Sequence, residues 1–201
     1  MQRNIWILFV FVAGVAAIIV ALGEPAKALL AYRPDFIVRA EYWRAVSGHF
    51  THMGWPHLAL NMSGLASIFW LYHKVLGAVG WTVLLLGLSL LTTAAYLILS
   101  PNVPTYLGLS AVLHGMLAAA LLLAVYDELR AGTREGLIEH VVIGAGLIAK
   151  LVWEATVGPV PLTEALASGP VAAEAHLYGA VGGVAFAAMH VAMQRLFRRR
   201  P

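Results

Sequence analysis

Five polar side chains of the kinds that take part in hydrolysis lie near the starts of three apolar segments: His57, Asn61, Ser110, His114 and His176. His57 and Asn61 are four residues apart, as are Ser110 and His114, so on a helix each pair shares one face. A histidine beside a serine hydroxyl can remove the hydroxyl proton during attack and return it to the leaving group afterwards. These residues therefore favour serine hydrolysis, with Ser110 as nucleophile and His176 as general base.

The other polar groups are suited to stabilising the negative charge that develops on an attacked carbonyl oxygen. His57, Asn61 and the backbone N–H of Ser110 are hydrogen-bond donors, and a helix starting at Ser110 aims its positive dipole end at the same point. Taken singly, each residue also has an ordinary interpretation, as a helix cap or as a hydrogen-bonded group at a helix end. No aspartate offers itself as a third member, and an ionised carboxylate at membrane depth is costly, so we expect a Ser–His dyad.

The composition places these side chains in a membrane. Of the 201 residues, 61% are hydrophobic and 11% are charged, whereas soluble domains average about 45–50% and about 25%. This excludes a soluble enzyme, a disordered chain and a nucleic-acid binder, although the net charge is +3. The chain has no cysteine and no HExxH motif, and His49 and His52 lack a third zinc ligand at suitable spacing. We therefore expect no metal and no cofactor.

Six apolar segments are long enough to cross a bilayer: residues 4–23, 56–72, 75–99, 109–126, 137–158 and 175–193. We expect an all-α, polytopic membrane protein whose six transmembrane helices form one domain over residues 1–201. The first segment also has an interpretation as a signal peptide, but its length and the spans that follow favour a membrane span. The long first loop, residues 24–55, is rich in aromatic residues, which predicts an interfacial substructure.

Lys and Arg are distributed unevenly between the two sides that six spans define. With a cytoplasmic N-terminus, eight of them, including Arg199 and Arg200, fall on the cytoplasmic side and four in the first loop. The positive-inside rule then predicts that both termini are cytoplasmic. The second, fourth and sixth spans start on the opposite side, so His57, Ser110 and His176 would meet there.

Small residues lie beside the two candidate catalytic side chains. Gly179 and Gly183 follow His176 by three and seven residues and share its helical face. A similar stripe follows Ser110: Ala111, Gly115 and Ala118. Small residues let two helix backbones approach closely, as a hydroxyl–imidazole contact of about 3 Å requires.

Three motifs, in this order, resemble those of the rhomboid family of intramembrane serine proteases. Trp43-Arg44, followed by His57-x-x-x-Asn61, resembles the family's loop motif and second helix. Residues 108–111, Gly-Leu-Ser-Ala, resemble its Gly-x-Ser-Gly, and residues 175–183 resemble its Ala-His-x-x-Gly-x-x-x-Gly. The resemblance covers about residues 41–183 and implies the same roles for Ser110 and His176. It assigns supporting roles to the other motif positions, among them Trp43, Arg44, Gly108, Gly179 and Gly183.

Two positions depart from the usual rhomboid pattern. Ala111 stands where the family usually has glycine, which adds a methyl group beside the nucleophile. His114 stands where many rhomboids have a tyrosine that stacks on the catalytic histidine. That histidine, with the surrounding residues 106–115, resembles the rhombosortase branch. This implies single-span protein substrates of the bacterial inner membrane that end in a Gly-Gly sorting signal: a Gly-rich motif, a membrane helix and a basic tail.

The fifth span carries a charged pair, Lys150 and Glu154, four residues apart and hence on one face. We favour mutual neutralisation that allows both residues to be buried. The alternative is that Glu154 recognises or orients a substrate strand beside the fifth helix.

Other functions remain open at this stage. They are a general rhomboid protease with other transmembrane substrates, and a non-catalytic rhomboid-like protein that binds membrane helices. A small transporter is less favoured, because the sequence has no paired broken helices and no inverted repeat. The presence together of Ser110, His176, His57 and Asn61 favours the enzyme. Its expected partners are membrane-protein substrates and the lipid bilayer, with no nucleic acid, and the sequence sets no oligomeric state.

Overall fold

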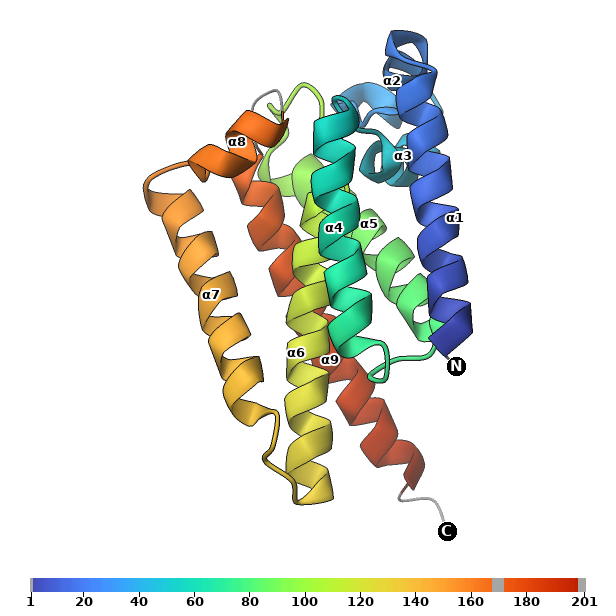
Figure 1. Cartoon of the computed structure of the whole chain (residues 1–201). Helices are drawn as coiled ribbons and strands as arrows, with labels where there is room; N and C mark the ends of the chain where they lie inside the picture. The colour runs from blue at the N-terminus through green and yellow to red at the C-terminus, as the bar shows by residue number, and fades with distance from the viewer. Residues whose placement is uncertain (1, 168–171, 199–201) are drawn as a thin grey trace.

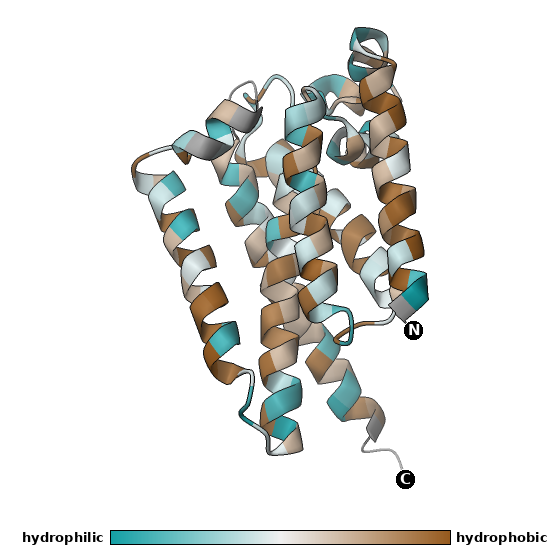
Figure 2. Ribbon diagram, in the orientation of Figure 1, coloured by the Kyte–Doolittle hydropathy of each residue, from teal (hydrophilic) through white to brown (hydrophobic). Residues whose placement is uncertain are grey.

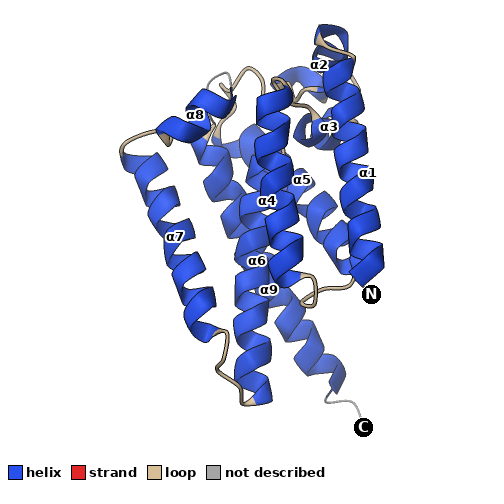
Figure 3. Ribbon diagram, in the orientation of Figure 1, coloured by secondary structure: helices blue, strands red, loops and turns tan. Residues whose placement is uncertain are grey.

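The computed structural model describes residues 2–167 and 172–198; Arg199 and Arg200, which the charge count includes, lie outside this part of the chain. The described residues form helices and no strand (Figures 1 and 3). The elements are α1 (Gln2–Ala21), α2 (Glu24–Leu30), the short 3-10 helix η1 (Pro34–Phe36), α3 (Arg44–Phe50), α4 (Trp55–Tyr72), α5 (Ala78–Leu99), α6 (Ser110–Ala131), α7 (Leu137–Thr156), α8 (Pro161–Ala167) and α9 (Ala173–Arg198).

The long helices run side by side around α6, which packs against α4, α5, α7 and α9 (Figure 1). The buried core follows α6, which contributes Val112 and Met116. Its neighbours fill the rest: α4 with Leu65 and Phe69, and α5 with Trp81 and Leu88. The starts of α4 and α9 lie at one end of the bundle, and the chain's two ends lie at the other (Figure 1). The expected common direction of these helices is therefore present.

Hydrophobic residues recur along the long helices of the bundle (Figure 2). Large apolar side chains are exposed on several of them: Val10, Phe11, Trp70, Val79, Ile98, Ile138 and Val141. A surface of this kind is unfavourable in water and stable against lipid.

Four helices in the described residues are long and apolar enough to cross a membrane: Arg3–Ala21, Ala78–Leu99, Ser110–Ala131 and Ala173–Phe197. They make the chain an integral, multi-pass membrane protein. Polar residues such as His57 and Asn61 lower the mean hydropathy of α4, and α7 carries three charged residues: Glu139, Lys150 and Glu154.

The first loop folds into three short helices, α2, η1 and α3, and its place at the membrane interface stays a prediction. Arg44 is 3% exposed and donates hydrogen bonds to Ala28 O at 3.0 Å and Ala31 O at 2.8 Å. The indole N–H of Trp43 donates to Leu29 O at 3.1 Å. The last carbonyls of a helix lack intrahelical donors, so the Trp-Arg pair caps the end of α2 and fixes it on α3.

Two details differ from the sequence-based expectation. α8 was not expected, although Pro161 at its start is well suited to the first turn of a helix. α6 and α9 also continue beyond the predicted ends of their apolar segments, to Ala131 and Arg198. Polar residues continue a helix where its end lies outside the apolar region.

Candidate active site

The segment before α6 is held in place by Gly108. Its φ of +119° is strained for any residue with a side chain, and an added Cβ would lie 2.8 Å from His57 Cε1. The Gly108 N–H donates to Gly48 O at 3.1 Å, which ties the segment to α3. Burial raises the pKa of Tyr106 to about 12, so the phenol keeps its proton and donates it to Gly108 O at 2.7 Å. Gly108 thus lets the start of α6 lie directly against His57 of α4.

The predicted small-residue contact brings α6 and α9 together. A Cβ on Gly179 would overlap the carbonyl oxygen of Ala111, and one on Gly183 would overlap that of Gly115. No larger residue fits at either glycine without moving a helix. The prediction of close approach is therefore confirmed, and Ala111, itself fully buried, is accommodated beside it.

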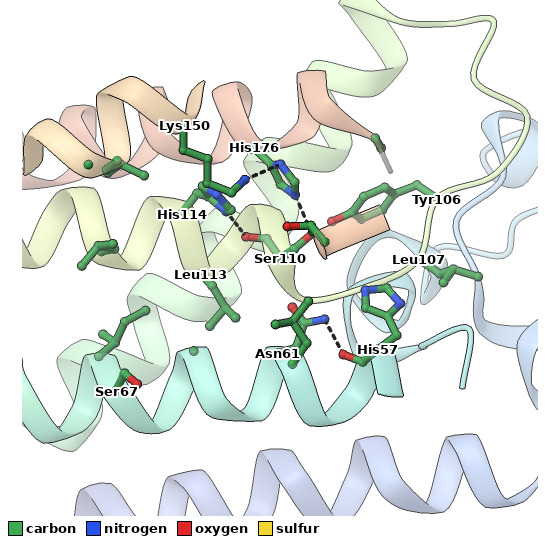
Figure 4. Close-up of a pocket in the computed structure, with 18 of the residues that line it drawn as sticks. His57, Asn61, Ser67, Tyr106, Leu107, Ser110, Leu113, His114, Lys150 and His176 are labelled. Atoms are coloured by element: carbon green, nitrogen blue, oxygen red, sulfur yellow. Dashed lines mark hydrogen bonds between the residues drawn. The ribbon is translucent and has the colours of Figure 1, made fainter. Parts of the chain in front are cut away.

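This approach places the hydroxyl of Ser110 next to the imidazole of His176, as Figure 4 shows. Ser110 is the first residue of α6, and its Oγ lies 3.0 Å from His176 Nε2. His176 is 2% exposed. The distance is that of a hydrogen bond between the hydroxyl and the imidazole.

His114 stacks on His176, the position that the resemblance assigns to an aromatic ring. The ring centroids are 4.1 Å apart and the planes are inclined by 15°. His114 Nδ1 lies 2.7 Å from Ser110 O, and because a carbonyl only accepts, Nδ1 carries the proton. His114 therefore restricts the rotation of the His176 ring and is itself held by the first turn of α6.

A carboxylate also contacts the pair, so the expectation of a site without one is wrong. Glu154 Oε2 lies 2.7 Å from His176 Nδ1, and the Glu154 side chain is 1% exposed. Lys150 Nζ lies 2.6 Å from Glu154 Oε1 and 3.4 Å from His176 Nδ1. The ammonium of Lys150 offsets the negative charge of Glu154 and so lowers the cost of burying this carboxylate. The i,i+4 spacing predicted the ion pair, but only the packing of α7 on α9 shows that it reaches His176.

His57 and Asn61 face Ser110 from α4 across a cavity (Figure 4). Met53 N donates to His57 Nδ1 at 3.4 Å, which leaves the proton of a neutral ring on Nε2. Asn61 Nδ2 donates one hydrogen to His57 O at 2.9 Å and keeps a second. Burial and the neighbouring His57 lower the pKa of His52 to about 3, so His52, whose ring packs edge-on against His57, is neutral there.

The cavity has a volume of about 590 Å³ and lies between α4, α6, α7 and α9. Its polar end holds His57, Asn61, Ser110, His114, Lys150 and His176, and its other end is apolar and reaches Leu71 and Leu117.

A metal ion is a second use to which such residues are put. His114, Glu154 and His176 have ligand atoms within 4.8 Å of one another. A metal lies in the plane of each imidazole that binds it, however, and nearly parallel rings 4.1 Å apart have no common point in their planes near the nitrogens. The three residues are thus arranged for hydrogen bonding and stacking.

The comparison with protein families agrees with the motifs. A family model, the Rhomboid domain, matches residues 39–193, about three quarters of the chain and all of the site described above. A search of the curated proteins finds no significant match. Because the matched segment covers far more than half of the chain, this protein belongs to the rhomboid family, whose members are in general intramembrane serine proteases.

Proposed function

We propose that the protein is an intramembrane serine endopeptidase in which Ser110 is the nucleophile and His176 the general base. The observation that carries the proposal is the 3.0 Å contact between Ser110 Oγ and His176 Nε2 at the polar end of the cavity. His176 takes the hydroxyl proton as Ser110 attacks a substrate carbonyl and returns it to the leaving amine. A water molecule then releases the acyl group from Ser110 by the same proton transfers.

His57, Asn61 and the first backbone N–H groups of α6 are proposed to stabilise the tetrahedral oxyanion. The Nε2–H of His57 can serve as a donor, because Nδ1 of the same ring already accepts a hydrogen bond from Met53 N. Asn61 can donate its second amide hydrogen, because the first is hydrogen-bonded to His57 O. The N–H groups of the first turn of α6 have no partner within the helix, and the helix dipole adds partial positive charge at the same point. Donors placed where charge develops contribute more than donors that bind substrate alone.

We further propose that α4 and α7 also cross the membrane, which makes six spans in one domain of residues 1–201. The polar residues that lower the apolar character of these two helices support this, since His57, Asn61 and Glu154 are buried and Lys150 lines the cavity instead of the outer surface. The positive-inside rule then places both termini in the cytoplasm of a bacterium and opens the active site to the periplasmic side of the inner membrane.

The proposed substrates are single-span membrane proteins with a Gly-rich motif before an apolar span and a basic tail, as for a rhombosortase. His114 at the stacking position supports this branch. The apolar end of the cavity is suited to the apolar span of such a substrate. Glycines before that span lower the cost of unwinding the substrate helix, which must happen before a backbone carbonyl is exposed.

Cleavage in proteoliposomes tests the proposal. The probe is a fluorescent reporter joined by a Gly-rich segment to an apolar span and an Arg cluster, with a matched probe in which the glycines are replaced by leucine. We expect wild-type protein to cleave the first probe, Ser110→Ala to cleave neither, and the second probe to be cut much more slowly. Equal cleavage of both probes would contradict the substrate class and indicate a general rhomboid protease. Binding of the probe without cleavage by the wild type would contradict the enzyme and indicate a rhomboid-like binder.

A further inference from the structure

We propose that Glu154 is the third member of a Ser110–His176–Glu154 triad, as a positioning residue that acts through His176, and that Lys150 holds it in place. This inference rests on the proposed function, because it concerns the base of the same reaction. It also changes the role of the charged pair on α7, from the neutralisation of two buried charges to a direct part in orienting the imidazole.

The bonding of the imidazole requires a particular tautomer. An ionised carboxylate only accepts hydrogen bonds, so the 2.7 Å contact of Glu154 Oε2 requires a proton on His176 Nδ1. The neutral ring then has its lone pair on Nε2, 3.0 Å from Ser110 Oγ. This is the tautomer that a general base needs. In the alternative tautomer, Lys150 would donate to His176 Nδ1 over 3.4 Å, and the ring proton would lie on Nε2, facing the serine. Nε2 could then not accept the hydroxyl proton of Ser110.

The charges around the ring favour the protonated imidazole that forms during attack. In the resting site, Lys150 and Glu154 offset each other at 2.6 Å. When His176 takes the proton from Ser110, a positive charge appears inside the bundle, and the nearest charged atom is the Glu154 oxygen at 2.7 Å. The ammonium of Lys150 is farther away at 3.4 Å, and its side chain is 28% exposed to the cavity. Glu154 therefore stabilises the intermediate more than Lys150 opposes it.

Neither other interpretation of Glu154 accounts for both of its oxygens. Neutralisation requires only the contact between Lys150 and Oε1. Substrate recognition requires an accessible carboxylate, yet the Glu154 side chain is 1% exposed and does not line the cavity, while Lys150 does. The contact of Oε2 with His176 is explained by orientation of the base.

The experiment compares variants of the pair in proteoliposomes, with kcat and KM for the Gly-rich probe expressed per folded protein. Glu154→Gln alone leaves the Lys150 charge unpaired, so the decisive variant is the double change Lys150→Met with Glu154→Gln, which removes both charges and keeps a similar shape. Glu154→Asp keeps the carboxylate. Glu139→Gln, an exposed glutamate on the same helix, is the matched control.

We expect the double variant to unfold near the wild-type temperature while kcat falls by roughly 10²–10⁴-fold, the contribution of general-base catalysis, with KM changed by less than about threefold. Glu154→Asp should recover part of the lost kcat, and Glu139→Gln should match the wild type. A double variant with kcat within about threefold of the wild type would overturn the triad, as would a loss confined to KM. If the double variant does not fold, the Asp variant decides: a kcat no higher than that of Glu154→Gln also overturns it.

Failure of the proposed function has a separate signature. In that case the wild type and Ser110→Ala are equally inactive toward the probe, and no variant of Glu154 can be compared. A wild type that is active and a Ser110→Ala variant that is not, together with an active double variant, would retain the protease and remove only the triad.

Discussion

Gly179→Ala should separate the two helices that carry Ser110 and His176. The added Cβ would overlap the Ala111 carbonyl oxygen and lie 2.6 Å from its carbonyl carbon, where ordinary contact begins at 3.4 Å. Relief of the contact with the carbonyl carbon alone moves α9 away from α6 by at least about 0.8 Å, and the closer oxygen requires more. Such a shift stretches the 3.0 Å contact between Oγ and Nε2 beyond hydrogen-bonding distance. A misplacement of about 1 Å costs on the order of 10²-fold in rate, and overpacking costs about 1–3 kcal/mol of stability.

The assay is probe cleavage at saturating substrate, with thermal unfolding in the same detergent. Gly87→Ala on α5 is the matched control, because its Cβ would meet nothing within 4 Å. We expect Gly179→Ala to lose roughly 10²-fold in kcat and Gly87→Ala to keep the wild-type rate with slightly higher stability. Equal rates for the two variants would refute the reasoning that close helix approach sets the distance between nucleophile and base.

Three further outcomes follow from the same structure. His57→Ala should lower kcat by about 10²–10³-fold, as loss of one oxyanion donor does, and a change in KM alone would contradict that role. Arg44→Leu leaves the Ala28 and Ala31 carbonyls without their donor, which should lower the free energy of unfolding by about 1–3 kcal/mol; unchanged thermal unfolding would contradict the cap. Burial lowers the pKa of His49 from 6.5 to about 4, so the folded protein favours the neutral ring. The free energy of unfolding should therefore be highest above pH 6.5 and fall by about 3 kcal/mol towards pH 4 as the unfolded chain takes up the proton. His49→Gln should flatten this dependence in chemical unfolding, and an equal slope would assign it to other groups.

Much of the fold follows from local patterns in the sequence. Apolar segments predict the long helices because a helix in lipid satisfies its own backbone. The spacing of Gly179 and Gly183 from His176 predicts the side on which α9 meets α6. In contrast, the sequence did not predict α8, because a helix of seven residues is too short to show a clear hydrophobic period.

The site was predictable where its residues share a helix, and less so where helices meet. The i,i+4 spacings of Ser110 with His114 and of Lys150 with Glu154 carry over directly to the structure. The contact between Glu154 and His176 joins α7 to α9 and depends on how the two helices are rotated. No spacing within one helix encodes that rotation, which is why the sequence led to a dyad where the structure has a buried carboxylate.

Mass spectrometry of the protein treated with a serine-reactive fluorophosphonate tests the central claim most directly. The phosphonate bonds to an activated serine oxygen and stays there, so peptide mapping identifies the nucleophile without knowledge of the substrate. The account predicts one adduct, on Ser110 at the start of α6, that is lost in His176→Ala. An adduct on another serine, or equal labelling of Ser110 in wild type and His176→Ala, would contradict it.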